Sequence, residues 1–64
     1  MGNIESSFID VRIKLPQQNQ RVIAYNNKLN EFIVAYFKNG KFYENDKELV
    51  NITRWIENNN NIEI

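Results

Sequence analysis

The sequence contains neither cysteine nor histidine. Without cysteine there is no disulfide framework, and without either residue the usual zinc clusters are excluded. The same absence excludes a serine or cysteine nucleophile that is activated by histidine. Glycine is scarce as well, with two residues, so no glycine-rich loop is present to cradle a phosphate. We therefore expect no metal site, no cofactor and no catalytic residue.

An excess of charge of one sign and long hydrophobic runs are also lacking. Eight Lys and Arg residues balance eight Asp and Glu residues, so the overall field steers neither a phosphate nor a polycation toward the protein. No apolar run approaches the ~18 residues of a membrane span. Acidic Glu5 and Asp10 are unlike the start of a signal peptide. We expect a cytoplasmic protein whose partner is neither a nucleic acid nor a membrane.

Three carboxylates, Glu44, Asp46 and Glu48, stand close together in the sequence. Paired carboxylates can act as acid and base in glycoside chemistry, and they can also bind cations. These three lie in a predicted turn, where solvent surrounds them, and the turn lacks the ligand spacing and the glycine of an EF-hand. We read them as solvated turn charges and predict that the protein is not an enzyme.

The alternation of apolar and polar residues predicts strands. In residues 8–15 the side chains of Ile9, Val11, Ile13 and Leu15 fall on one side, which is typical of a half-buried strand. Further strands are predicted over residues 21–25, 31–38, 41–44 and 49–56. The sequence thus predicts an all-β fold, a small antiparallel sheet of four to five strands that forms an SH3-like or partly open barrel.

The length of the chain limits its core. A chain of 64 residues is one domain, and folding at this size buries only about 60% of the surface that the unfolded chain exposes. We place this single β domain at residues 1–57 and expect a flexible, asparagine-rich tail at 58–64. Stability must come from apolar packing, either within the chain or shared with a second subunit.

The strongest local signal is the turn Asn39-Gly40 between two aromatic segments. Both residues can take a positive φ, as a type I′ turn requires, and a two-residue loop fixes the register of the hairpin. The register places Lys38 opposite Lys41, Phe37 opposite Phe42, and Tyr36 opposite Tyr43. The two lysines repel mildly, whereas each aromatic pair stabilises the hairpin by about 0.2–1 kcal/mol. The aromatic pairs therefore outweigh the repulsion between the lysines.

This hairpin is apolar on both faces, but a single barrel buries only one of them. Phe37 and Phe42 share one face, and Tyr36 and Tyr43 share the other. Phenylalanine has no polar atom to satisfy, whereas a tyrosine hydroxyl needs water or a partner. We therefore expect the phenylalanines in the core and the tyrosines in an outer patch. The alternative is that long side chains and the two termini cover the patch.

The segment "NITRWI" contains the only tryptophan. Trp55 either closes the sheet or contacts a partner, and its position opposite in pleat to Ile52 and Ile56 favours the packing role. Arg54 lies among apolar neighbours on its face of the pleat. A buried arginine without a carboxylate is costly, so we expect Arg54 at the rim of the sheet or beside an acidic residue. If this segment carries specificity, Arg54 is the better candidate.

The segments "FIDVRIKLP" and "NITRWI" resemble two motifs of a domain-of-unknown-function family of short bacterial and phage proteins, W-I-x-V-x-x-x-L-P and V-T-H-W-M-P-L-P. The resemblance spans residues 8–56, with Phe8 at the first tryptophan and Trp55 at the second. Arg54 replaces the histidine of the family, so no role of that histidine is carried over. The resemblance implies a phage or prophage setting and an accessory role, and the family has no established activity.

These observations lead to one functional hypothesis and two alternatives. The hypothesis is a non-enzymatic binding module of phage or prophage origin that occupies a host protein in the host cytoplasm, for example to inhibit a host enzyme or defence system. The alternatives are a small barrel that binds single-stranded nucleic acid and a structural subunit of a homo-oligomer, a homodimer included. The candidate partner-binding residues are Tyr36, Tyr43, Arg54, Trp55, Lys38 and Lys41.

Overall fold

The computed structural model describes residues 8–58, so the predicted tail at 58–64 lies outside the described residues except for Asn58. The described chain forms one antiparallel sheet of six strands in the order β1-β6-β2-β3-β4-β5. The strands are β1 (Ile9–Asp10), β2 (Arg21–Asn26), β3 (Glu31–Lys38), β4 (Lys41–Glu44), β5 (Lys47–Leu49) and β6 (Ile52–Glu57). No segment of residues 8–58 forms a helix that could cross a bilayer.

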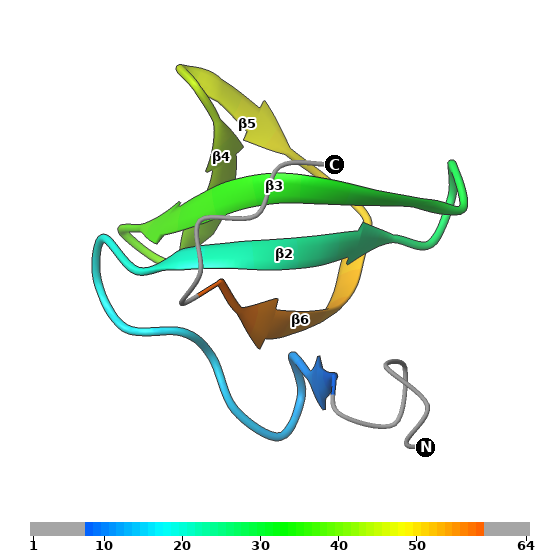
Figure 1. The fold of residues 1–64 in the computed structure, drawn as a ribbon, viewed down its shortest axis with the longest axis horizontal. Coiled ribbons are helices and arrows are strands. Elements are labelled where there is room, and N and C mark those ends of the chain that lie inside the picture. Colours follow the sequence, from blue (N-terminus) through cyan, green and yellow to red (C-terminus); the bar gives the residue numbers. More distant parts are fainter. Residues whose placement is uncertain (1–7, 59–64) are drawn as a thin grey trace.

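The sheet curls into a small barrel that stays open on one side. In Figure 1, β2 and β3 run side by side along the long axis, and the hairpin of β4 and β5 runs across their direction. Two residues, Val50 and Asn51, lead from β5 back to β6, which pairs with β1 on one side and with β2 on the other. The predicted fold class is confirmed, with six strands where four to five were predicted.

The first predicted strand, over residues 8–15, is wrong in extent, because β1 ends at Asp10. The Asp10 carboxylate accepts a hydrogen bond from the backbone N–H of Arg12 at 2.8 Å. The Asp10 carbonyl accepts one from the N–H of Ile13 at 2.9 Å, so the chain turns instead of extending. Ile13 and Leu15, which were expected on the buried side, are 82% and 50% exposed. A short polar side chain that bonds its own backbone competes with the strand here.

The predicted strand at residues 49–56 is divided into the end of β5 and the whole of β6. Asn51 separates them with a φ of 61°, a left-handed conformation that asparagine tolerates better than most residues. Its carbonyl accepts a hydrogen bond from the N–H of Asn27 at 2.9 Å. Periodicity alone does not reveal such a break, because one left-handed residue leaves the alternation on either side intact.

The hairpin of β3 and β4 has the predicted register, with Lys38 opposite Lys41 and the aromatic pairs behind them. Asn39 and Gly40 have φ values of 53° and 82°, so both central residues of the turn are left-handed. The phenylalanine face is the buried one, as expected. The core cluster consists of Val22, Ala24, Ala35, Phe37, Phe42 and Trp55, and Ile9, Val11, Leu49 and Ile52 pack against it.

Two buried asparagines fasten the ends of the barrel. Asn26 is 5% exposed, donates through Nδ2 to the carbonyl of Val50 at 3.1 Å and accepts through Oδ1 from the N–H of Leu29 at 2.8 Å. It therefore ties the turn between β2 and β3 to the connection between β5 and β6. Asn58, also 5% exposed, donates its backbone N–H to the carbonyl of Arg21 at 3.1 Å. This bond holds the end of β6 against the start of β2.

Candidate functional site

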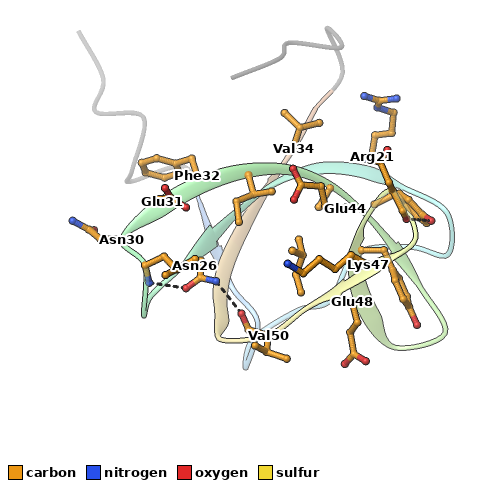
Figure 2. A pocket seen from close by; sticks show the side chains of 17 residues that line it. Arg21, Asn26, Asn30, Glu31, Phe32, Val34, Glu44, Lys47, Glu48 and Val50 are labelled. Carbon is orange, nitrogen blue, oxygen red and sulfur yellow. Dashed lines mark hydrogen bonds between the residues drawn. The ribbon is translucent and has the colours of Figure 1, made fainter.

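The open side of the barrel forms a groove of about 1050 Å³ along β3, which we call the β3 groove. One wall is the first half of β3, with Phe32 and Val34, and the other is β5 with Leu49. Asn26 lies at one end of this space, and Lys47 extends into it from β5 (Figure 2). The groove combines apolar side chains with a few polar groups, as binding sites usually do, and it is the candidate site.

The groove exists because two paired strands differ in length. β3 has eight residues and β4 has four, and a two-residue loop joins them at the start of their ladder. β4 therefore pairs only with the second half of β3, from Tyr36 to Lys38. The chain then turns at Asn45, whose φ is 57°, and enters β5. The first half of β3 has β2 on one side and the open groove on the other.

Tyr36 and Tyr43 form the end of the groove nearest the hairpin. Their rings are stacked, with centroids 5.9 Å apart and an angle of 25° between the planes. The hydroxyl of Tyr36 donates to the carbonyl of Asn45 at 2.6 Å, which fixes the ring against the turn between β4 and β5. Both side chains are half-buried. The pair therefore presents a rigid aromatic surface that is already ordered before any partner arrives.

The two candidate lysines lie opposite each other between this tyrosine pair and the Asn39-Gly40 turn. Lys38 lines a second, smaller hollow of about 180 Å³ together with both tyrosines and Asp46. Lys41 points elsewhere, because its Nζ lies 3.6 Å from a carboxylate oxygen of Glu48. The structure thus brings Lys38 together with the tyrosines, whereas Lys41 forms an exposed ion pair with Glu48 on β5.

Trp55 lies in the core and does not face the groove. Its side chain is 3% exposed, and its Nε1–H donates to the carbonyl of Lys14 at 2.9 Å. Its register partners are Ile9 on β1 and Ala24 on β2. A ring buried to this extent packs the barrel and has no surface to offer a partner, which is the role that the sequence favoured.

Arg54 lies on β6, between β1 and β2, and so is not at the rim of the sheet. Its register partner on β1 is the acidic residue Asp10, whose carboxylate binds Arg12. The guanidinium carbon lies 4.2 Å from the centroid of the Tyr25 ring. The Tyr25 ring is 5.0 Å from that of Phe32, which is 5.4 Å from that of Phe8. Arg54 thus lies at one end of a row of side chains in mutual contact, in which a cation–π contact to Tyr25 is followed by two tilted aromatic pairs.

The charges around the groove are mixed. Two cations, Arg21 and Lys47, and three carboxylates, Glu31, Glu44 and Glu48, line it. Two ion pairs occur within residues 8–58, Arg12 with Asp10 and Lys41 with Glu48, so Glu31 and Glu44 are in neither. No three His, Cys, Asp or Glu side chains of the described chain gather closely enough to hold a metal ion.

Sequence reasoning missed the apolar wall of this site. Phe32 and Val34 were placed on the same face of the hairpin as Tyr36 and Tyr43 but were not named as candidates, and the contribution of Leu49 on β5 went unrecognised. One signal could have found them. The Asn39-Gly40 turn fixes the register, and the polar turn that follows Glu44 limits β4 to four residues, so the first half of the eight-residue β3 has no partner from the hairpin.

Comparisons with known proteins give the chain no relatives. It matches no protein-family model, no curated protein and no solved structure. The resemblance of its two end segments to a family of short bacterial and phage proteins therefore stays a prediction.

Proposed function

We propose that the chain is a non-enzymatic binding module of phage or prophage origin that acts by binding a host protein, for example to inhibit a host enzyme or defence system. The observation that supports binding is the β3 groove, which combines apolar walls with the stacked pair of Tyr36 and Tyr43. Concave surfaces with apolar walls and a few polar groups are typical binding sites, and tyrosine is enriched in interface hot spots. The phage setting rests on the sequence resemblance alone.

The charges of the groove favour a protein over a nucleic acid. Its three carboxylates outnumber its two cations, whereas single-stranded nucleic acid requires a positively charged groove beside the aromatic side chains. Retention of a labelled oligonucleotide at low salt tests this alternative. Retention that weakens steeply as salt is added would favour the nucleic-acid-binding barrel over the protein-binding module.

The third alternative is a structural subunit of a homo-oligomer. Light scattering on a size-exclusion column gives the mass directly, and a monomer of 7.7 kDa is the expected result. A stable dimer or larger assembly that depends on the tyrosine pair would instead show that the groove is an interface between copies of the chain.

The main test is affinity purification of the tagged chain from a bacterial lysate, with a variant that alters the groove. We expect the wild type to retain one protein in stoichiometric amount and the double variant Tyr36→Ser, Tyr43→Ser to lose it. Ile13→Ser is the matched control, since Ile13 is an exposed apolar residue outside the groove. Fluorescence of buried Trp55 verifies that each variant folds. A wild type without a stoichiometric partner, or a partner that ignores the tyrosine changes, rejects the proposal.

A further inference from the structure

The direction of the backbone groups of β3 follows from one residue. In an antiparallel sheet, successive residues direct their N–H and C=O groups to opposite neighbours. Phe37 donates its N–H to the carbonyl of Gln20 at 3.0 Å and accepts from the N–H of Asn19 at 2.6 Å, both on the side of β2. The odd-numbered residues of β3 therefore face β2, and the even-numbered residues face the side of β4.

Only part of that second side is occupied. β4 extends along Tyr36 and Lys38 among the even-numbered residues. Phe32 and Val34 direct their N–H and C=O groups the same way, where no strand of residues 8–58 pairs with them. Both residues line the β3 groove. The wall of the groove is therefore a sheet edge with two donors and two acceptors.

This edge lacks the protection that natural proteins give to exposed strands. Edges are usually short, charged or bulged, because an apolar edge pairs with other chains. β5 follows this rule, since it has three residues and carries Lys47 and Glu48. The open half of β3 carries Phe32, Ile33 and Val34 without a charge between them. Of the two edges that border the groove, the uncharged, apolar edge of β3 is therefore the one that can pair with an added strand.

We propose that this edge binds an extended segment of the partner protein as an added strand, antiparallel to β3 and in line with β4. The inference rests on the proposed function and specifies how the partner is held. Main-chain hydrogen bonds to Phe32 and Val34 supply affinity, and side chains of the added strand supply specificity. Directly opposite Ile33 an apolar side chain packs beside Leu49, which also lines the groove.

Charge gives the added strand a second feature. Glu31 is exposed at the start of β3 and takes part in neither of the ion pairs within residues 8–58. Glu31 and Ile33 lie on the same face of β3, because they are two residues apart. The residue of the added strand opposite Glu31 therefore lies two positions after the apolar one, and a basic side chain suits it. The recognised segment is thus an extended one with the spacing apolar-x-basic.

Amide hydrogen exchange of the wild-type chain tests the edge without any partner. The N–H groups of Ile33 and Ala35 face β2, whereas those of Phe32 and Val34 face the groove. We therefore expect the amides of Phe32 and Val34 to exchange at least about tenfold faster than the amides of Ile33 and Ala35. Protection of Phe32 and Val34 in the monomer would mean that another segment of the chain holds the edge. Protection that grows with protein concentration would mean that a second copy holds it. Either result overturns the inference.

A synthetic peptide then serves as the probe. We use the capped hexapeptide STVTKS, which has the spacing apolar-x-basic, and two matched peptides, STVTES and STVTKS with N-methyl groups on both threonines. At millimolar concentration STVTKS should slow the exchange of Phe32 and Val34 by about tenfold. STVTES should bind several-fold more weakly, and the N-methylated peptide should give no protection. Equal protection by all three peptides, or none by STVTKS, overturns the inference.

One variant separates this inference from the proposed function. Val34→Pro removes an N–H that points into the groove and breaks no bond to β2, and proline is tolerated at such an edge. Val34→Ala is the matched control, because it keeps the N–H. We expect Val34→Pro alone to lose the peptide and the captured protein. A tyrosine-dependent partner that Val34→Pro still captures overturns strand addition and leaves the proposed function standing, whereas absence of any such partner rejects the proposed function.

Discussion

Among the described residues, Asp10 has the most strongly shifted pKa. Its carboxylate accepts hydrogen bonds from the Arg12 side chain at 2.8 Å and from the Arg12 backbone N–H at 2.8 Å. These bonds, the side-chain one first, lower the pKa of Asp10 from 3.8 to about 2. A folded pKa below the unfolded value means that the ionised group stabilises the fold above pH 3.8, and that this contribution is lost as the pH falls toward 2.

We expect an NMR titration of the carboxyl carbon to give Asp10 a pKa of about 2 in the wild type. Arg12→Ala should raise this pKa only part of the way to 3.8, because the backbone N–H at position 12 still donates. Lys14→Ala is the control, since no side-chain bond joins Lys14 to Asp10 within the described residues. An Asp10 pKa that Arg12→Ala leaves unchanged would contradict the pairing.

Asn26 shows how one buried polar side chain holds two connections of the barrel. Replacing it by alanine leaves the N–H of Leu29 and the carbonyl of Val50 without their partner. Each of the two lost hydrogen bonds contributes about 0.5–1.5 kcal/mol, so we expect Asn26→Ala to lower the free energy of unfolding by about 1–3 kcal/mol. Urea denaturation followed by Trp55 fluorescence measures it. The neighbouring Asn27→Ala, an exposed residue that keeps its backbone bond, should change stability by much less.

At the scale of elements, asparagine shapes every connection between successive strands. Within residues 8–58, the residues with positive φ, apart from glycine, are Asn19, Asn30, Asn39, Asn45 and Asn51, and each lies in a different one of the five connections. Asparagine adopts the left-handed conformation more readily than other residues with a side chain, because its short amide can bond the local backbone. The asparagines that look merely frequent in the sequence therefore supply a left-handed residue to each connection between strands.

Asn51 offers a direct test of this role. Its side chain is exposed, and its φ of 61° is unfavourable for an ordinary L-residue. We expect Asn51→Ala to lower the free energy of unfolding by about 1–2 kcal/mol, the cost of a left-handed residue. Asn51→Gly should be close to the wild type, since glycine has no such cost. Chemical denaturation of the three chains decides, and equal stability of the Ala and Gly variants would count against the role.

The sequence predicted a strand or turn correctly where residues next to each other in the chain determine it. The hairpin of β3 and β4 was predicted with its register because Asn39-Gly40 permits one turn type. The extent of β1 was missed because alternation does not show that Asp10 bonds Arg12. The groove was missed although its cause is local, since the lengths of β3 and β4 follow from two turns.

At the scale of the whole molecule, the contacts that sequence reasoning could not supply join distant segments. The guanidinium of Arg54 stacks on Tyr25 because β6 lies beside β2, and no local pattern gives that strand order. The Nε1–H of Trp55 donates a hydrogen bond to the carbonyl of Lys14, because the loop between β1 and β2 passes over the core. The sequence can predict that Trp55 packs in the core, but the acceptor of its hydrogen bond depends on the fold.

The core also joins strands that the sheet leaves apart. β5 has ladder bonds with β4 alone, yet Leu49 packs against the cluster that contains Trp55 of β6 and Val22 of β2. A single core in a chain this small rarely supplies more than about 3–5 kcal/mol. Because both halves of the barrel share that core, neither half has enough apolar contact to stay folded without the other.

We therefore expect one cooperative unfolding transition, in which Trp55 fluorescence and far-UV circular dichroism give the same urea midpoint. Leu49→Ala should lower both midpoints together, because its side chain joins β5 to the shared core. Ile13→Ala is the control, since Ile13 is 82% exposed. If Leu49→Ala instead speeds amide exchange in β4 and β5 while the Trp55 midpoint stays at its wild-type value, the β4–β5 hairpin unfolds on its own and the barrel is not one cooperative unit.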